Sequence, residues 1–204
     1  MKNLFLFLFL LVVFTSKAQD NRVSGLNSRQ FTKYWKVESE SPDYKVTFQV
    51  DTAEIVSPKG LTLWRKEKMS GKVTIEYDAC VVVESDGDRL SDLNCFWMAS
   101  DPQYPDNLWK REKWRSGIFL NCYSLQLYYL GYGGNHNSTT RFRRYDGDES
   151  GITNPKARPA ILKEYTDAGH LLKPNHWYHI KITNENNRVS YYIDGERLVD
   201  FRYA

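Results

Sequence analysis

Residues 128–147 read Tyr-Tyr-Leu-Gly-Tyr-Gly-Gly-Asn-His-Asn-Ser-Thr-Thr-Arg-Phe-Arg-Arg-Tyr-Asp-Gly, which is the pattern of a strand, a glycine-rich loop and a second strand. The first extended run stops at Gly133-Gly134, because glycine turns the chain without steric cost. Side chains alternate along a strand, so the second strand has two distinct faces. One face carries Thr140, Phe142 and Arg144, and the other carries Thr139, Arg141, Arg143 and Tyr145.

The face with Arg141 and Arg143 concentrates positive charge beside the phenol of Tyr145. The preceding loop adds the polar side chains Asn135, His136 and Asn137. Ordering such long polar side chains costs conformational entropy that a partner must offset. We therefore expect this face to bind an anionic ligand.

The rest of the chain repeats short extended runs separated by turn signals, without a strong helical period. In the run over 71–83, apolar side chains alternate with polar ones, and residues 53–56 and 61–65 suggest a hairpin around 57–60. These features predict an all-β, antiparallel jelly-roll sandwich of the concanavalin-A-like kind. The expected strands are 31–38, 45–50, 53–56, 61–65, 71–83, 93–99, 118–132, the run from Thr139, 176–183, 188–193 and 198–203.

The first residues have the features of a signal peptide. Lys2 precedes an unbroken apolar run over 4–14, and small residues flank a cleavage position after Ala18. The run is too short for a transmembrane helix, which needs about 20 apolar residues. We predict a signal peptide over 1–18, a single domain over 19–204, and a secreted or periplasmic protein without a membrane anchor.

Charge and cysteine content narrow the function further. The net charge is +3, and basic residues are dispersed apart from those over 141–144, which argues against a nucleic-acid partner. Aromatic residues make up 15% of the chain, which suits both a sandwich core and a surface that stacks on sugars. The three cysteines allow at most one internal pair and show no metal-binding spacing.

One candidate chemistry uses the carboxylates Glu76 and Asp78. They lie two residues apart on one face of the strand predicted over 71–83, so they could serve as the acid and the nucleophile of a glycoside hydrolase on a concave sheet. The glucanase pattern Glu-x-Asp-x-Glu lacks its last acid, because position 80 is Cys80. A solvated strand face is the simpler interpretation.

A second candidate chemistry is that of a polysaccharide lyase acting on a uronate. Such an enzyme neutralises the carboxylate, abstracts the neighbouring proton and protonates the leaving oxygen. Arg141 or Arg143 would meet the carboxylate, His136 would take the proton, and Tyr145 or Tyr132 would protonate the leaving group. The alternative is a structural loop in which hydrogen bonds hold His136 and the arginines pair with Asp146 and Asp148.

A third candidate is a non-catalytic carbohydrate-binding module. Trp109 and Trp114 lie among basic residues in a long loop and could stack on sugar rings, whereas Trp97 lies in an apolar strand and should be core. We predict no cofactor and no catalytic metal. The turns over 86–88 and 146–148 could each hold a structural calcium ion, although neither matches the full calcium-loop pattern.

Four segments resemble an exported bacterial family related to YesU-type proteins. These are 75–78, 90–99, 132–147 and 171–178, of which Arg-Phe-Arg-Arg-Tyr-Asp-Gly over 141–147 is the most specific. The resemblance implies a concanavalin-A-like fold and a role in the use of rhamnogalacturonan and related polysaccharides. Folds of this kind usually continue beyond the hairpin at Asp194-Gly195, so we expect that the chain lacks its last strand or strands.

Taken together, the sequence favours a monomeric exported protein that acts on an acidic polysaccharide. A uronate-directed lyase is the leading hypothesis. A hydrolase using Glu76 and Asp78 and a non-catalytic binding module are the alternatives. The expected sugar-binding residues around the catalytic candidates are Asn135, Tyr132, Asn137, Trp109, Trp114, Glu76 and Asp78.

Overall fold

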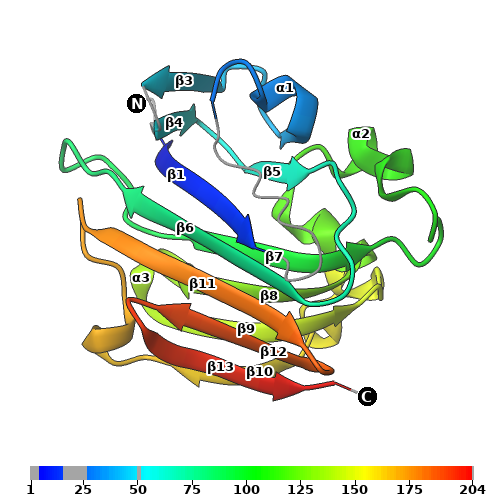
Figure 1. Ribbon diagram of the computed structural model, residues 1–204. Coiled ribbons are helices and arrows are strands. Elements are labelled where there is room, and N and C mark those ends of the chain that lie inside the picture. Colours follow the sequence, from blue (N-terminus) through cyan, green and yellow to red (C-terminus); the bar gives the residue numbers. More distant parts are fainter. Residues whose placement is uncertain (1–4, 16–26, 50–51, 204) are drawn as a thin grey trace.

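The computed structural model describes residues 5–15, 27–49 and 52–203, and it forms antiparallel sheets packed against each other (Figure 1). The larger sheet has the strand order β13-β12-β11-β6-β1-β4-β3, a four-stranded sheet has the order β10-β9-β8-β7, and β2 pairs with β5. The predicted antiparallel jelly-roll-like sandwich is confirmed.

The strands are β1 (Phe5–Thr15), β2 (Trp35–Ser39), β3 (Lys45–Gln49), β4 (Thr52–Ser57), β5 (Leu61–Arg65), β6 (Val73–Val81), β7 (Leu93–Ser100), β8 (Gln126–Gly133), β9 (Thr139–Asp146), β10 (Ile161–Tyr165), β11 (Trp177–Glu185), β12 (Arg188–Ile193) and β13 (Glu196–Arg202). Short α-helical turns are α1 (Phe31–Tyr34), α2 (Glu112–Arg115), α3 (Gly134–Asn137) and α4 (Ser150–Thr153). The 3-10 turns are η1 (Leu108–Arg111), η2 (Phe119–Ser124), η3 (Pro155–Ala157) and η4 (Ala168–His170).

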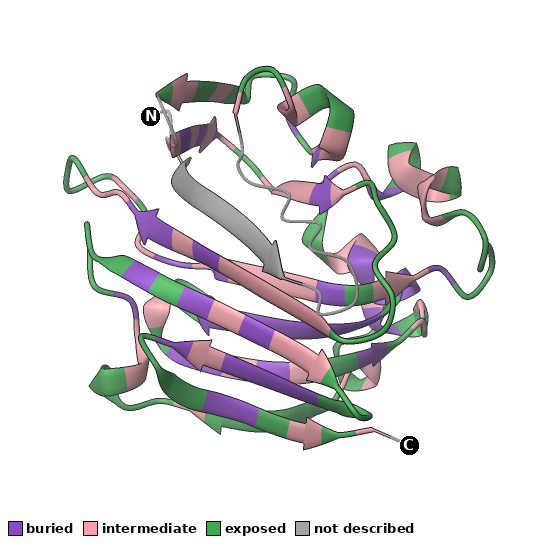
Figure 2. Cartoon of the chain, viewed as in Figure 1, coloured by how far each residue is buried: buried purple, intermediate pink, exposed green. Residues whose placement is uncertain are grey.

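The main core lies between the larger sheet and the four-stranded sheet. Trp97 of β7 is its centre, as predicted for a core tryptophan, and its ring lies 6.0 Å from Phe142 and 5.7 Å from Tyr191. Buried and exposed positions alternate along many of the strands (Figure 2). This alternation is the period of two that β structure requires, and it fixes which side chains face outward.

A second core covers part of the outer face of the four-stranded sheet. The strand pair β2–β5 and the segment 101–124 lie over this face, where Trp64, Tyr123, Tyr129 and Tyr145 pack together. The four-stranded sheet therefore packs apolar side chains on both faces, over the main core on one and over part of the other. The uncovered remainder of the outer face is where the candidate site lies.

Three sequence predictions about local structure are wrong. The strand predicted over 118–132 begins only at Gln126, because residues 119–124 form the 3-10 turn η2. β4 and β5 do not pair with each other, since β4 pairs with β3 and β1 while β5 pairs with β2. Residues 31–34 form the turn α1 rather than the start of a strand. By contrast, β11, β12 and β13 form consecutive hairpins as predicted, with Asp194-Gly195 at the second turn.

The glycine-rich loop between β8 and β9 turns through left-handed backbone conformations. Gly133 has a φ of +65°, and Asn135, His136 and Asn137 have φ values of 52–56°. A Cβ on Gly133 would lie 2.6 Å from the Leu172 side chain, so only glycine fits there. The Asn137 amide exchanges hydrogen bonds with the backbone N–H and C=O of Leu172 at 2.8 and 2.9 Å.

The signal-peptide prediction concerns residues that the structure describes only in part. The backbone of 5–15 forms β1 between β4 and β6. Export, cleavage after Ala18 and the predicted lack of final strands stay predictions. The three cysteines, Cys80, Cys95 and Cys122, are unpaired.

His170 gives the fold a pH-dependent contact between η4 and β13. Its Nδ1 lies 2.8 Å from the Asp167 carboxylate and its Nε2 lies 3.0 Å from Glu196. Partial burial lowers the pKa of His170, but the hydrogen bonds to the two carboxylates outweigh it, so the pKa is raised overall.

This contact predicts a pH-dependent effect of His170→Gln on stability. Because the pKa is raised on folding, the contribution is fully present below the unfolded pKa of about 6.5 and is lost as the pH rises through the folded value. Urea unfolding should therefore show a larger difference between wild type and His170→Gln at pH 5.5 than at pH 8.5. An equal difference at both pH values would contradict the prediction.

Candidate functional site

Two rows of side chains cross the outer face of the four-stranded sheet, and the second row enters the second core at Phe96 and Tyr129. In the first row, Asn94 of β7 pairs with Gly131 of β8, Gly131 with Arg141 of β9, and Arg141 with Glu164 of β10. In the second row, Phe96, Tyr129 and Arg143 follow one another across β7, β8 and β9. The register thus brings residues distant in sequence into one surface.

Gly131 leaves room at the centre of this surface for the side chain of Tyr129. A Cβ on Gly131 would lie 2.0 Å from the Tyr129 hydroxyl. That hydroxyl donates a hydrogen bond of 3.0 Å to Oδ1 of Asn94, which leaves the amide N–H₂ of Asn94 as a donor. Burial, with a further contribution from the charge of Asp92, raises the pKa of Tyr129 well above its ordinary value, so the phenol stays protonated.

Two of the three arginines of β9 are each anchored at one position of the guanidinium. Nε of Arg141 lies 2.5 Å from Oε1 of Glu164, and Arg143 donates to the backbone carbonyl of Pro159. Within the part of the chain that the structure describes, these are the polar contacts of the two guanidiniums. Both side chains therefore keep further N–H groups for a ligand while their positions are held by the protein.

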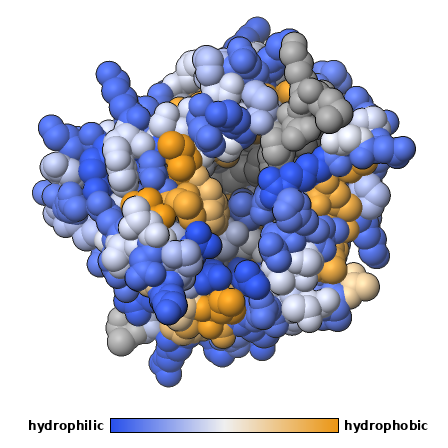
Figure 3. Space-filling view, turned by 180° about the vertical axis from the view of Figure 1, so that it is seen from behind, coloured by the Kyte–Doolittle hydropathy of each residue, from blue (hydrophilic) through white to orange (hydrophobic). Residues whose placement is uncertain are grey.

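The two rows form part of the lining of a hollow of about 1270 Å³. We call it the basic hollow. Figure 3 shows the corresponding face of the molecule hollowed near its centre, with hydrophilic residues beside hydrophobic ones. Apolar surface comes from Met98 and Phe119, whose residues are 44% and 36% exposed, and the Phe119 ring lies 5.5 Å from that of Tyr129. Guanidinium groups and exposed apolar surface thus line one cavity.

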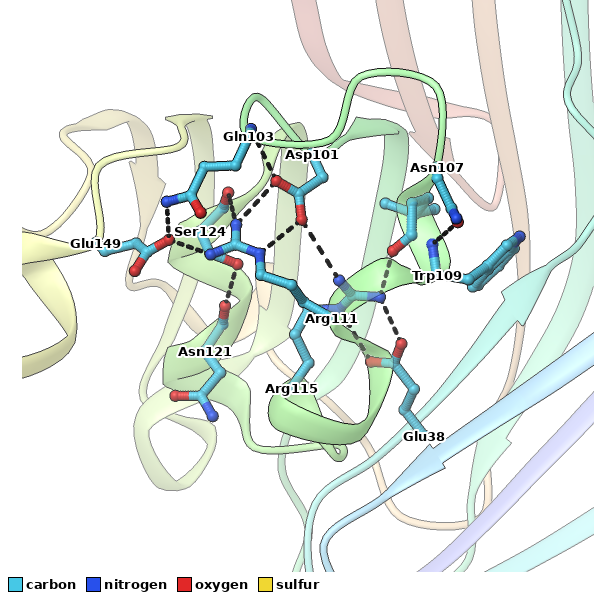
Figure 4. Close-up of polar contacts among 11 residues, drawn as sticks. Glu38, Asp101, Gln103, Asn107, Trp109, Arg111, Arg115, Asn121, Ser124 and Glu149 are labelled. Carbon is cyan, nitrogen blue, oxygen red and sulfur yellow. Dashed lines mark hydrogen bonds and ion pairs between the residues drawn. The ribbon is translucent and has the colours of Figure 1, made fainter.

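A buried ion-pair network fixes the segment 101–124 that brings Phe119 to the basic hollow (Figure 4). Arg115, which is 0% exposed, donates to both oxygens of Glu38 on β2, at 2.6 and 3.2 Å. Arg111 holds Asp101 through two hydrogen bonds of 2.8 Å and also contacts Glu149. These contacts hold the wall of the hollow against β2 and against the loop after β9.

The structure brings only some of the predicted catalytic residues to the hollow. Arg141, Arg143 and Tyr145 share one face as predicted, but Tyr145 is 1% exposed beneath the segment 101–124. The pKa of Tyr145 is raised well above its ordinary value, mainly by burial, so the phenol is unsuited to proton transfer. His136 is exposed and does not line the hollow, so the prediction that it shares a groove with the arginines is wrong.

Of the predicted sugar-binding residues Asn135, Asn137 and Tyr132, only Asn135 lies at the basic hollow. Asn135 lines the basic hollow, whereas the Asn137 amide is held by Leu172 in a structural contact. Tyr132 points into the main core on the opposite face, and its hydroxyl donates to the carbonyl of Leu171 at 3.3 Å. The prediction that Tyr132 faces the ligand is therefore wrong.

Glu76 and Asp78 lie on the outer face of the larger sheet, away from the basic hollow. Glu76 lies 2.8 Å from Nζ of Lys181, and Asp78 lies 2.8 Å from Nδ1 of His179. Neither carboxylate lines the hollow. Both carboxylates face away from the four-stranded sheet, because the apolar face of β6 is the one that packs on it, so they do not share a site with Arg141 and Arg143.

The two candidate tryptophans have different environments. Trp109 lines the basic hollow, where Nζ of Lys36 lies 5.3 Å from its ring centre. Trp114 is exposed outside the hollow, with the guanidinium of Arg111 5.3 Å from its ring. Only Trp109 is therefore placed to contact a ligand held by the arginines.

Sequence reasoning missed Asn94, Tyr129 and Phe119, which line the hollow. Asn94 and Tyr129 could have been found from the strand alternation, once β7 and β8 were paired in register with β9. Phe119 lies on η2, and a 3-10 turn in a long connection leaves no periodic signal.

Neither a metal site nor a membrane span is evident in the described part of the chain. No three His, Cys, Asp or Glu side chains gather there as candidate ligands. No helix among those residues is long and apolar enough to cross a membrane. In the turns over 86–88 and 146–148, Asp88 accepts backbone hydrogen bonds from Glu84 and Ser85, and Asp148 accepts one from Ser150.

Comparisons with known proteins add a family and a distant structural likeness. The model of a domain of unknown function, DUF6250, matches residues 55–204. A carbohydrate-binding module of Bacillus subtilis, CBM66, is 12% identical over 83% of this chain and 80% of its own, with a TM-score of 0.38. No curated protein matches the chain. A likeness this distant leaves the function to be inferred from the geometry of the hollow.

Proposed function

This chain belongs to the DUF6250 family of unknown function, and we propose that it binds an acidic carbohydrate in the basic hollow without cleaving it. The observation that carries the proposal is the pair Arg141 and Arg143, two residues apart on one strand face, each anchored yet with N–H groups to spare. A sugar carboxylate can accept two such N–H groups in a charge-assisted contact.

The remaining lining suits a sugar ring. Phe119 and Met98 offer apolar surface, on which the C–H face of a pyranose can pack. The free amide N–H₂ of Asn94 can donate to a sugar hydroxyl, since its Oδ1 is already taken by Tyr129. Charge, apolar surface and amide donors together support a carbohydrate rather than a simple inorganic anion.

The same lining supports binding more than it supports catalysis. A lyase needs a base and an acid beside the carboxylate that the arginines hold. Among the described residues that line the hollow there is no histidine, and the phenols of Tyr129 and Tyr145 have raised pKa values. Three of the carboxylates in the lining, those of Glu40, Glu67 and Asp92, are paired with basic side chains. A hydrolase using Glu76 and Asp78 would work on the other sheet, where both carboxylates are engaged by basic side chains.

The first ligands to test are galacturonate-containing polysaccharides. The resemblance to YesU-type proteins favours rhamnogalacturonan, and polygalacturonate presents the same carboxylate without branches. Affinity electrophoresis in gels that contain each polysaccharide should retard the protein. If neither these nor glucuronate-bearing ulvan and arabinogalactan retard it, the proposal fails. Growth of the absorbance of unsaturated uronates during incubation would instead establish a lyase.

Arg143→Met should weaken binding of an acidic oligosaccharide by roughly 10- to 100-fold. The estimate follows from the loss of charge-assisted hydrogen bonds, worth about 1.5–3 kcal/mol. Isothermal titration calorimetry with oligogalacturonate measures it. The matched control is Arg144→Met on the same strand, because Arg144 is exposed and does not line the hollow. Equal binding by both variants would remove the arginine pair from the site.

A further inference from the structure

Besides Arg141 and Arg143, the guanidinium of Arg158 lines the basic hollow and has no role in the contact proposed above. Arg65 and Arg89 also line the hollow, but they pair with Glu67 and Asp92. It follows η3 in the loop between β9 and β10, one residue before Pro159, whose carbonyl accepts a hydrogen bond from Arg143. Among the described residues, Arg158 forms no ion pair or hydrogen bond. Arg158 is an exposed residue.

The positive charges of Arg143 and Arg158 both affect one part of the hollow, beside Tyr123. Burial raises the pKa of the Tyr123 phenol, and the positive charges of Arg158 and Arg143 both oppose that rise. Both guanidiniums are therefore within electrostatic range of one phenol. Neither forms an ion pair with a carboxylate in the described part of the chain, so this part of the hollow keeps a positive potential that favours an anion.

The backbone at Arg158 is held firmly although its side chain is free. A Cβ on Gly151 would lie 3.1 Å from Cα of Arg158 and 3.2 Å from the Tyr123 ring, so α4 packs closely against this segment. The side chain of Asn154 caps η3 by accepting from the backbone N–H of Lys156 at 3.1 Å. A fixed backbone with a free guanidinium is a suitable arrangement for ligand recognition, because only the side chain has to be ordered.

A ligand with a single carboxylate would not neutralise the positive charge of Arg141, Arg143 and Arg158. Arg141, Arg143 and Arg158 carry three positive charges, and Glu164, the carboxylate that pairs with Arg141, supplies one negative charge. One bound uronate would leave a positive charge uncompensated at Arg158. A ligand with two neighbouring acidic groups would compensate it.

We propose that Arg158 is a specificity-determining residue that binds a second anionic group of the same glycan, so that the hollow selects oligouronates over isolated uronates. This inference rests on the proposed carbohydrate binding through Arg141 and Arg143. Arg143 holds the first carboxylate, and Arg158 holds the carboxylate of the adjoining sugar. Neutral chains and single uronates gain nothing from Arg158.

The test compares galacturonate with digalacturonate as ligands of the wild type, Arg158→Gln and the control Arg144→Gln, by isothermal titration calorimetry. The wild type should bind digalacturonate about tenfold or more tightly than galacturonate, as expected for one added charge-assisted contact. Arg158→Gln should reduce that ratio to near one through weaker digalacturonate binding alone. Arg144→Gln should keep the wild-type ratio.

Other outcomes separate the two proposals. An unchanged ratio in Arg158→Gln, or an equal loss of both ligands, would overturn the role of Arg158 while the site at Arg143 stands. If the wild type bound neither galacturonate nor digalacturonate and no polysaccharide retarded it in a gel, the proposed function would be overturned. This inference would then fail with it. Circular dichroism of the exposed-residue variants checks that each is folded.

Discussion

Arg115→Met is expected to lower the free energy of unfolding by about 3–5 kcal/mol. Arg115 and Glu38 are both buried, and the guanidinium bridges the carboxylate and the carbonyl of Leu108 at 2.8 Å. Methionine is apolar and of similar length, so it leaves the Glu38 carboxylate buried without its counter-charge. Urea unfolding followed by tryptophan fluorescence measures the change, which corresponds to a melting temperature lower by roughly 6–20 °C.

Two further variants identify the cause of that loss. Arg188→Met breaks an exposed ion pair with Asp200 and should cost no more than about 1 kcal/mol. The double variant Arg115→Met with Glu38→Leu removes both buried charges, so it should be more stable than Arg115→Met alone. If the double variant were the less stable of the two, the uncompensated carboxylate would not be the source of the destabilisation.

The buried pair matters for function because it positions one wall of the hollow. Arg115 is the last residue of α2, and Phe119 begins η2 shortly after it in the chain. Gly117 packs so closely on β2 that a Cβ there would lie 2.6 Å from the carbonyl of Glu38. We therefore expect loss of the pair to weaken carbohydrate binding as well as folding.

Alternation along the sequence correctly assigned the two faces of β9. Phe142 enters the main core, and Arg141 and Arg143 face outward, because a one-residue slip would bury the guanidiniums and expose the apolar side chain. The same rule failed for Tyr145. Its face was predicted correctly, but alternation does not reveal that the segment 101–124 covers that end of the strand.

Pairing between distant strands was the part of the fold that the sequence could not supply. The turn signal over 57–60 is real, yet the strands on either side pair with partners elsewhere in the chain. Turn residues report local backbone conformation, whereas the choice of partner depends on which apolar faces meet in the folded state. Without the pairing of β7 with β8, Asn94 could not be placed beside Gly131 and Arg141.

Gly131→Ala is expected to weaken carbohydrate binding more than tenfold and to lower the free energy of unfolding by about 1–3 kcal/mol. The added methyl would lie 2.0 Å from the Tyr129 hydroxyl and 2.6 Å from its Cζ, both far inside van der Waals contact. Tyr129 cannot turn aside, because its ring is buried against Phe96 at 5.3 Å and Phe119 at 5.5 Å. Relief of the clash must displace Asn94 or the aromatic wall.

The control for Gly131→Ala is Gly87→Ala, which adds the same methyl in a turn where the nearest atom would be 3.9 Å away. Calorimetric titration with oligogalacturonate and urea unfolding should leave that variant close to wild type. Gly131→Ala, if folded, should keep the fluorescence of the native state while losing the ligand, because the methyl disturbs the floor of the hollow and not the core behind it. Tight binding by Gly131→Ala would mean that the ligand does not depend on the arrangement of Tyr129 and Asn94, and the site would have to lie elsewhere in the hollow.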